Sequence, residues 1–123
     1  MTLDEVQAAF LAAGFCGIEA DQGVVYARIA PQAPEFRAEL CADGGEGQAW
    51  RLVLPWNVRP PQAAIAAWNA LMGAARMEIL AGEACLVMPF PDRGVLIRWA
   101  ALAAEAEVHF IRWRRERRPA EGM

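Results

Sequence analysis

The sequence predicts an α+β fold of two layers, in which an antiparallel sheet is covered by helices on one face. Three observations support this prediction. The two ends of the chain place apolar residues at helical spacing, the middle alternates apolar and polar residues with the period of a strand, and turn residues separate the alternating segments. The expected order is α-β-β-β-α-β-β-α in one domain spanning residues 1–123, a length that suits a single hydrophobic core.

The first expected element is a helix from about Asp4 to Ala13. The preceding segment, Thr2-Leu3-Asp4-Glu5, has the capping-box pattern, in which the two end residues each satisfy a free backbone amide of the other. Gly14 can adopt a left-handed conformation that ends the helix, and Phe15 can fold back onto its last turn in a Schellman-like contact. Three residues should form the inward stripe: Val6, Phe10 and Ala13.

Three strands are expected next, as an antiparallel meander. Asp21-Gln22-Gly23 is typical of a turn and separates a short segment around Ile18 from the first strand, Val24–Ile29. The second strand alternates from Phe36 to Ala42. The Gly-rich segment Asp43–Gly47 has the composition of a hairpin loop rather than of a phosphate-binding loop, because no helix N-terminus and no Gly-Lys pair follows it.

The third strand alternates until Pro55 ends it. Core packing is the simplest explanation for most of the five tryptophans, but Trp50 and Trp56 flank this strand and are less clearly interior. Aromatic residues are enriched where proteins meet partners, so partial exposure of these two at an interface is the alternative to burial. The candidate partner-binding residues on this strand are Trp50, Leu52, Leu54 and Trp56.

A second helix and a second hairpin follow. Pro60-Pro61 favours a helix start, because the first helical turn tolerates residues that lack an N–H group. Gly73 marks the helix end, and Ala81-Gly82-Glu83 predicts a tight turn between a strand containing Met77 and Ile79 and a strand spanning Ala84–Met88. The inward helix positions are Ala64, Ile65, Trp68, Leu71 and Met72.

The last element is a helix from Asp92, its N-cap, to about Arg118. A helix of that length is about 40 Å long, whereas a domain of this size is about 35 Å across. We therefore expect the basic tail, residues 112–123, to protrude or fray. One face of the helix carries Val95, Trp99, Leu102, Ala106, Phe110 and Trp113.

The residue types that perform catalysis are scarce. The chain has no Ser and no Lys, its single Thr is committed to a helix cap, and its single histidine is His109. Cys16, Cys41 and Cys85 are widely spaced in apolar surroundings, which is typical of small buried side chains in a reducing compartment. We expect no enzyme, no metal site and no cofactor; a catalytic site would need His109, a cysteine and a carboxylate to share one cleft.

The charge is distributed unevenly. Residues 112–118 contain five arginines and one acid, whereas the whole chain has a net charge of −3. Such a run is typical of a nucleic-acid contact, but an acidic body repels phosphate, and arginines also stabilise the C-terminus of a helix. Contact with acidic surface on a second subunit is a third interpretation. The candidate electrostatic contacts are Arg112, Arg114, Arg115, Arg117 and Arg118.

The order of elements resembles that of the YbjN-like family, whose fold is similar to that of the class I chaperones of type III secretion. The similarity is carried by the opening Val6–Phe15 and by Ala67–Leu71 followed by Ala75–Ile79, in which Asn69 occupies the position of the family's characteristic asparagine. The resemblance implies a homodimer of small acidic subunits without enzymatic activity. Class I chaperones hold an extended stretch of a client protein against hydrophobic patches and exposed sheet edges.

We therefore expect a non-catalytic, chaperone-like and homodimeric protein-binding module that binds a client polypeptide. The alternative is a YbjN-like regulator of undefined ligand that contacts nucleic acid through its C-terminal arginines, although the acidic body disfavours that partner. The acidic start, Met1–Glu5, differs from the basic start of a signal peptide, and no apolar run is long enough to span a membrane. The expected location is the cytoplasm.

Overall fold

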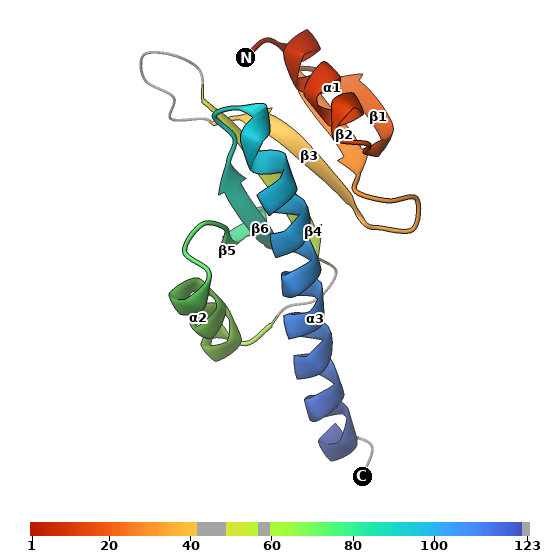
Figure 1. Ribbon diagram of the computed structural model, residues 1–123. Helices are drawn as coiled ribbons and strands as arrows, with labels where there is room; N and C mark the ends of the chain where they lie inside the picture. Colours follow the sequence, from red (N-terminus) through yellow and green to blue (C-terminus); the bar gives the residue numbers. More distant parts are fainter. Residues whose placement is uncertain (42–48, 57–59, 122–123) are drawn as a thin grey trace.

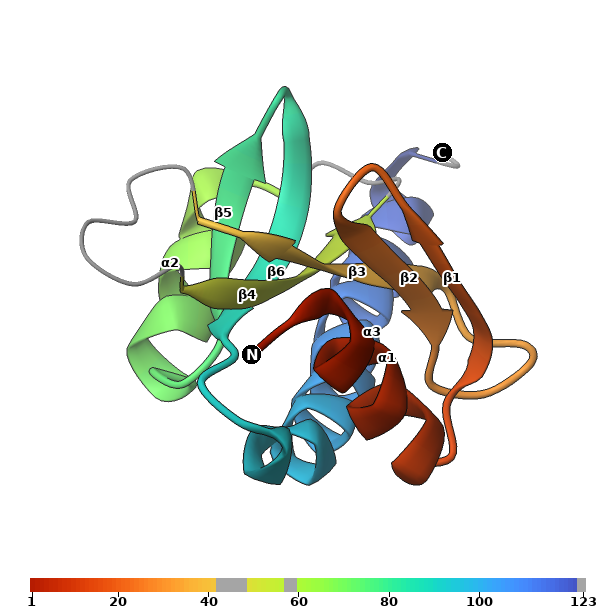
Figure 2. The same cartoon turned by 90° about the horizontal axis from the view of Figure 1, so that it is seen from above.

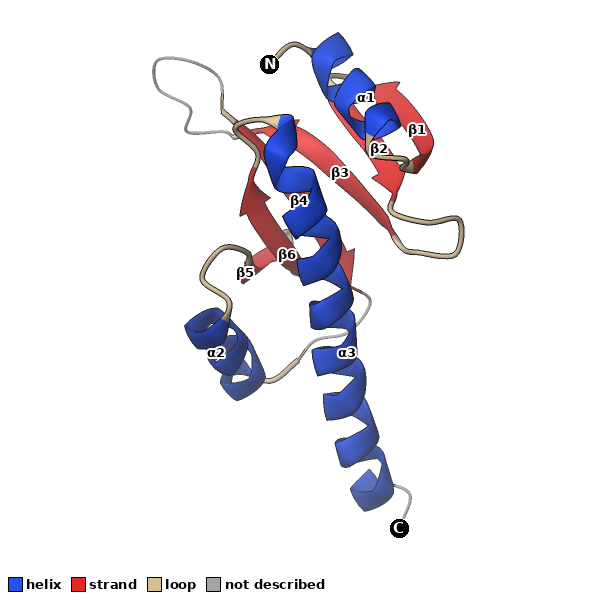
Figure 3. Cartoon of the chain, viewed as in Figure 1, coloured by secondary structure: helices blue, strands red, loops and turns tan. Residues whose placement is uncertain are grey.

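A computed structural model describes residues 1–41, 49–56 and 60–121, with side chains up to residue 110 (Figures 1 and 3). The elements follow one another as α1 (Leu3–Ala12), β1 (Cys16–Asp21), β2 (Val24–Arg28), β3 (Glu35–Leu40), β4 (Trp50–Trp56), α2 (Gln62–Leu71), β5 (Arg76–Leu80), β6 (Glu83–Pro89), the 3₁₀-helix η1 (Arg93–Val95) and α3 (Leu96–Glu121). None of the helices in the described part of the chain is long and apolar enough to cross a membrane.

The strands form one antiparallel sheet in the order β1-β2-β3-β4-β6-β5. Helix α1 packs over β1 and β2, α3 crosses the same face of the sheet, and α2 lies beside the edge strand β5 (Figures 1 and 2). The predicted α+β two-layer fold is therefore confirmed. Its core lies between the sheet and the helices, with Phe10, Phe36, Leu52, Trp68 and Trp99 among its largest side chains.

Both predicted tight turns connect strands by two residues in the left-handed region. Gln22 and Gly23 have φ of 52° and 80°, and Ala81 and Gly82 have φ of 50° and 83°. Two successive positive φ angles define the type I′ turn, whose twist matches that of the flanking strands. The glycine at the second position of each turn adopts this conformation without the steric cost of a side chain.

The number of strands before α2 is larger than predicted. The segment around Ile18, which the sequence pattern left outside the three expected strands, forms β1 and pairs with β2. Its alternation is obscured by a β-bulge at Gly17, which has a φ of 60° and shifts the register between Cys16 and Glu19. A bulge inserts one residue into the period of two, so the burial pattern does not resemble that of a regular strand.

The prediction that Pro55 ends its strand is wrong, because β4 continues through Pro55 to Trp56. Pro55 is opposite Cys85 of β6, whereas the registered pairs between β3 and β4 end at Arg37 and Val53. The alternation of the ladders places the nitrogen of Pro55 on the β3 side, beyond that last pair. The missing N–H group therefore interrupts no registered bond, which is the situation in which a strand tolerates proline.

The predicted helical stripes are largely correct but need three corrections. Ala13 is exposed and Ala9 is buried instead, and Leu71 of α2 is 76% exposed. Leu96 and Ala103 of α3 are buried, whereas Val95, which belongs to η1, and Leu102 of α3 are half-buried. The backbone of α3 runs past the sheet, as expected (Figure 1). The predicted hairpin loop at 43–47 lies outside the described residues.

Candidate protein-binding site at the edges of the sheet

The free edge of β5 is closed by two side chains of α2. The amide nitrogen of Asn69 donates to the carbonyl oxygen of Met77 at 3.1 Å, and the backbone N–H of Met77 donates to Oδ1 of Asn69 at 2.7 Å. One residue earlier on α2, the indole N–H of Trp68 donates to the carbonyl of Ala75 at 2.9 Å. The carboxamide of Asn69 thus presents one donor and one acceptor to β5, as a residue of a neighbouring strand would.

The ladder explains why Met77 is available to Asn69. Residues that flank a two-residue hairpin turn form a hydrogen-bonded pair, and such pairs alternate with non-bonded pairs along an antiparallel ladder. Leu80 and Glu83 flank the turn, so Met77, paired with Leu86, occupies a non-bonded position. Its N–H and C=O therefore point away from β6 and toward the free edge, and the same is true of Ile79.

The remainder of the β5 edge is exposed. The Ile79 side chain is 53% exposed although it lies on the same side of the strand as the buried Met77. Arg76 and Glu78 project from the opposite face of β5, are exposed, and take part in neither of the ion pairs found among the described residues. Beyond Met77, whose edge groups Asn69 occupies, the edge groups of Ile79 have no partner among the described residues, and Arg76 and Glu78 flank the covered Met77.

The other edge of the sheet, β1, has no such cover in the described part of the chain. Asp21 and Val24 flank the first type I′ turn, so the N–H and C=O of Ala20 point away from β2. Ala20 is exposed, and so are its neighbours Glu19 and Asp21, which both project from the sheet face opposite the helices. Within the described residues, nothing pairs with the edge groups of Ala20.

The sheet face opposite the helices carries an ion-pair network between β3 and β4. Glu39 accepts hydrogen bonds from Arg37 and from Arg51, and the Arg51 Nη2 to Glu39 Oε2 distance is 2.6 Å. Partial burial by itself raises the pKa of Glu39, but the hydrogen bonds from the two arginines outweigh it and hold the pKa below its ordinary value. Both cations are therefore engaged by one carboxylate.

Beside this network, the same face has a small apolar cluster of Val53, Cys85 and Val87, with Leu80 packed against it. Burial raises the pKa of the Cys85 thiol, so this thiol is less readily ionised than a free one. The cluster gives no indication of a reactive cysteine.

The residues predicted to contact a partner lie mainly in the core. Trp50, Leu52 and Leu54 are 7%, 0% and 3% exposed, so for Trp50 the structure shows burial and not the alternative of partial exposure at an interface. The indole N–H of Trp50 donates to the carbonyl of Met1 at 2.7 Å and fixes the start of the chain. Trp56 is half-buried against Phe110. All four side chains project toward the helical layer, and a partner could reach the three buried ones only if that layer moved away.

The structure does not bring the potential catalytic residues together in a cleft. His109 packs between Trp68 and Phe110, and its buried Nε2 atom has no hydrogen-bond partner within the described part of the chain. Among the described residues, no group of three or more His, Cys, Asp or Glu side chains is placed to hold a metal ion. Cys16, Cys41 and Cys85 are free thiols.

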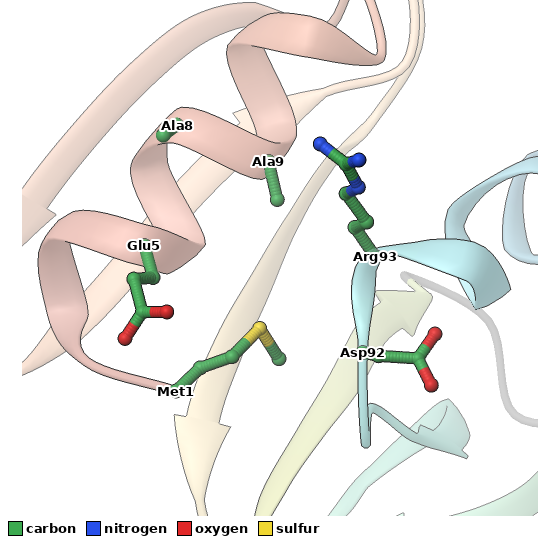
Figure 4. Close-up of a pocket in the computed structure, with 6 residues that line it drawn as sticks. All are labelled: Met1, Glu5, Ala8, Ala9, Asp92 and Arg93. Carbon is green, nitrogen blue, oxygen red and sulfur yellow. The ribbon is translucent and has the colours of Figure 1, made fainter.

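A cavity of about 380 Å³ lies between α1 and η1, lined by Met1, Glu5, Ala8, Ala9, Asp92 and Arg93 (Figure 4). Its two carboxylates already serve as helix caps: Glu5 accepts from the backbone N–H of Thr2, and Asp92 accepts from that of Gly94 at 2.7 Å. A second cavity of about 90 Å³, between the β2–β3 connection and α3, has Trp56 and Glu107 in its lining. Neither cavity is lined by His109 or by a cysteine.

The candidate electrostatic contacts Arg112, Arg114, Arg115, Arg117 and Arg118 belong to the C-terminal part of α3, where the side chains lie outside the described part of the structure. Their role stays a prediction. Two residues that matter at the edges were not identified as functional from their chemistry, Asn69 and Ala20. A polar residue in an otherwise apolar helix segment, as Asn69 is, was the pattern that could have indicated the first.

Comparison with known proteins adds no further assignment: the chain matches no family model, no curated protein and no solved structure.

Proposed function

We propose that this protein is a non-catalytic protein-binding module that acts as a homodimer and binds an extended segment of a partner polypeptide along the edge of β1. The observation that supports it is the contrast between the two edges: α2 satisfies the edge groups of Met77 on β5, whereas those of Ala20 on β1 are unpaired. An unpaired edge accepts a strand through main-chain hydrogen bonds, and this binding mode requires no nucleophile, metal or cofactor.

The side chains beside this edge define the chemistry of the partner. Glu19 and Asp21 are exposed on either side of Ala20 and project from the same face of the sheet. A strand added opposite Ala20 would place two of its own side chains, separated by one residue, opposite these carboxylates. Opposite charges in such cross-strand positions stabilise pairing, so the partner segment should carry basic residues at alternate positions.

The same carboxylates disfavour the pairing of β1 with β1 of a second copy. In an antiparallel pair centred on Ala20, Glu19 of each copy would lie opposite Asp21 of the other, and like charges placed directly opposite destabilise a pair. The bulge at Gly17 also limits regular pairing to the end of β1 near the turn. This edge is therefore suited to a short basic segment of another protein.

The test measures binding of a labelled synthetic peptide that alternates threonine and lysine, by fluorescence anisotropy at low salt. We expect saturable binding that is weakened about tenfold or more by Ala20→Pro, which removes the edge N–H, and retained in Ala20→Val, which keeps it. Because Ala20 donates nothing to β2, both variants should fold. A matched peptide that alternates threonine and glutamate should not bind.

The proposal fails if the lysine peptide does not bind the native protein, or if Ala20→Pro and Ala20→Val bind it equally well. Binding that is lost in a Glu19→Gln, Asp21→Asn double variant but unchanged in Ala20→Pro would indicate charge attraction without strand addition, and would also contradict the proposed mode.

A further inference from the structure

We propose that the edge of β5 pairs with the β5 edge of a second copy of this chain, antiparallel and with Met77 on the two-fold axis, and that Asn69 must leave the edge for this pair to form. This inference deepens the proposed function, because it names the surface through which the homodimer assembles. It depends on the geometry of β5 and α2 and not on the edge of β1.

The backbone of β5 can form the bonds of such a pair. The N–H and C=O of Met77 point toward the free edge, where Asn69 now occupies both of them. With Met77 on the two-fold axis, each copy's Met77 donates to the carbonyl of the other. Ile79 of each copy then faces Ala75 of the other. Ala75 is buried, its N–H donates to the carbonyl of Met72 and its carbonyl accepts from Trp68, so the main-chain bonds of this pair are the two between the Met77 residues.

The charges on β5 select this register. Arg76 and Glu78 flank Met77 and project from the same face of the sheet. A two-fold axis through Met77 places Arg76 of each copy directly opposite Glu78 of the other, so that two attractive pairs form at once. These are positions at which cross-strand side chains lie closest, because the flanking pairs of such a register are the non-bonded ones.

The neighbouring register that also uses the free edge groups is less favourable. If the axis passed through Glu78, Met77 of each copy would pair with Ile79 of the other, and the two Glu78 side chains would be directly opposed. Like charges in that position destabilise a strand pair. The sequence of β5 is therefore self-complementary in one register and repulsive in the next.

Asn69 competes with this pairing. A strand at the usual ladder spacing of about 4.8 Å would occupy the place of the Asn69 carboxamide, so α2 has to shift away from the edge. The N-cap of α2, Pro61, makes no side-chain capping bond, so the shift we infer is a local displacement of Asn69 about the buried anchor Trp68. Within the monomer, Asn69 thus substitutes for the strand of the second copy.

The test uses charge reversal on the full chain, because Arg76 and Glu78 are exposed and their replacement leaves the core unchanged. The dimer dissociation constant is measured by sedimentation equilibrium at low ionic strength. Arg76→Glu and Glu78→Arg should each weaken the dimer, by roughly tenfold, because each converts two attractive pairs into two repulsive ones. The double variant R76E/E78R restores both pairs and should return the constant to near its native value.

A second variant tests the competition. Asn69→Ala removes the groups that occupy Met77, so the dimer should become tighter, by about tenfold, because two partly buried hydrogen bonds no longer have to be broken. R76E and R76E/E78R made in this background should again weaken and restore the dimer. If Asn69→Ala does not fold, the charge series in the native background decides the question.

Three results would overturn the inference: a native protein and an Asn69→Ala variant that both stay monomeric at the highest soluble concentration, single charge reversals that leave dimerisation unchanged, or a double reversal that fails to restore it. Peptide binding at β1 is measured on the same samples. A failure of the β5 dimer with peptide binding intact overturns this inference alone, whereas the loss of peptide binding with an intact dimer overturns the proposed peptide-binding mode alone.

Discussion

The two ten-residue helices, α1 and α2, are held in place by different means. Both ends of α1 are closed by neighbours in the sequence: Thr2 and Glu5 complete a capping box, and the backbone N–H groups of Gly14 and Phe15 bond to Leu11 and Phe10 in a full Schellman motif. Helix α2 has no side-chain cap, no acidic residue in its first turn and no basic residue in its last.

In place of caps, α2 has contacts with a distant strand. Asn69 bonds to Met77 of β5, Trp68 bonds to Ala75 just before that strand, and the Trp68 ring packs against Phe110 of α3. A helix of ten residues is too short to be stable alone, so both helices depend on packing, but α1 also has a local capping box that α2 lacks. This difference is the reason that we place the conformational change at α2 and not at α1.

The largest expected effect comes from removing the buried aromatic anchor of each helix. Trp68→Ala and Phe10→Ala should each lower the free energy of unfolding by about 3–5 kcal/mol, because both side chains are almost completely buried. The two variants should differ in the hydrogen exchange of a single amide, that of Met77. In Trp68→Ala, the Met77 amide should exchange faster than global unfolding of that variant allows. In Phe10→Ala, it should exchange at the rate set by global unfolding. Equal exchange in the two variants would contradict a special link between α2 and β5.

A smaller effect is expected at Asn69. Asn69→Ala should lower the free energy of unfolding by about 1–3 kcal/mol, because the N–H and C=O of Met77 lose their partners. Alanine is the better helix former, so helix propensity alone predicts the opposite sign. The matched control is Gln7→Ala on α1, which should change stability by no more than about 0.5 kcal/mol. Denaturant unfolding at a concentration where the monomer dominates measures both variants, and a stabilised Asn69→Ala would sharply contradict the role of Asn69.

The smallest effect is expected at the cap of α1. Thr2→Ala should cost about 1 kcal/mol. The pKa of Glu5 is held below its ordinary 4.5, mainly by the hydrogen bond from the backbone N–H of Thr2 and secondly by the hydrogen bond from the Thr2 side chain. A lowered pKa means that the stabilisation is present above pH 4.5 and is lost as the pH falls through the folded-state value. An NMR titration of Glu5 should show a pKa below 4.5 that moves part of the way up toward it in Thr2→Ala, because alanine keeps the backbone N–H that has the larger effect; an unchanged pKa would show that the Thr2 side chain does not help to lower it.

The regions that were predicted correctly are those in which the physical cause lies within a few residues. The capping box, the left-handed Gly14 and the two turns that contain Gly23 and Gly82 depend on local geometry, so their sequence patterns were sufficient to predict them. The errors fall where distant strands decide. Pro55 continues β4 because the β3 ladder has already ended beside it, and β1 was missed because the bulge at Gly17 hides its alternation.

The candidate site was less predictable than the fold for the same reason. The sequence pattern identified Trp50, Leu52 and Leu54 as apolar residues on one face of a strand, but whether that face meets a partner or the helices of its own chain depends on where α1 and α3 pack. The structure places that face under the helices. Backbone N–H and C=O groups available to a partner lie at the sheet edges, and the pattern of side chains along a strand does not reveal which strand forms an edge.

The sequence by itself determined the class of fold, the ends of α1, the position of both hairpin turns and the scarcity of catalytic residue types, because each of these follows from composition or from contacts between near neighbours. The tertiary structure alone decided which sheet edge is open and which is closed. Asn69 lies eight residues before Met77, and no local preference brings a helix side chain onto a strand edge. That contact exists because the packing of α2 against β5 and α3 places a carboxamide where a neighbouring strand would otherwise lie.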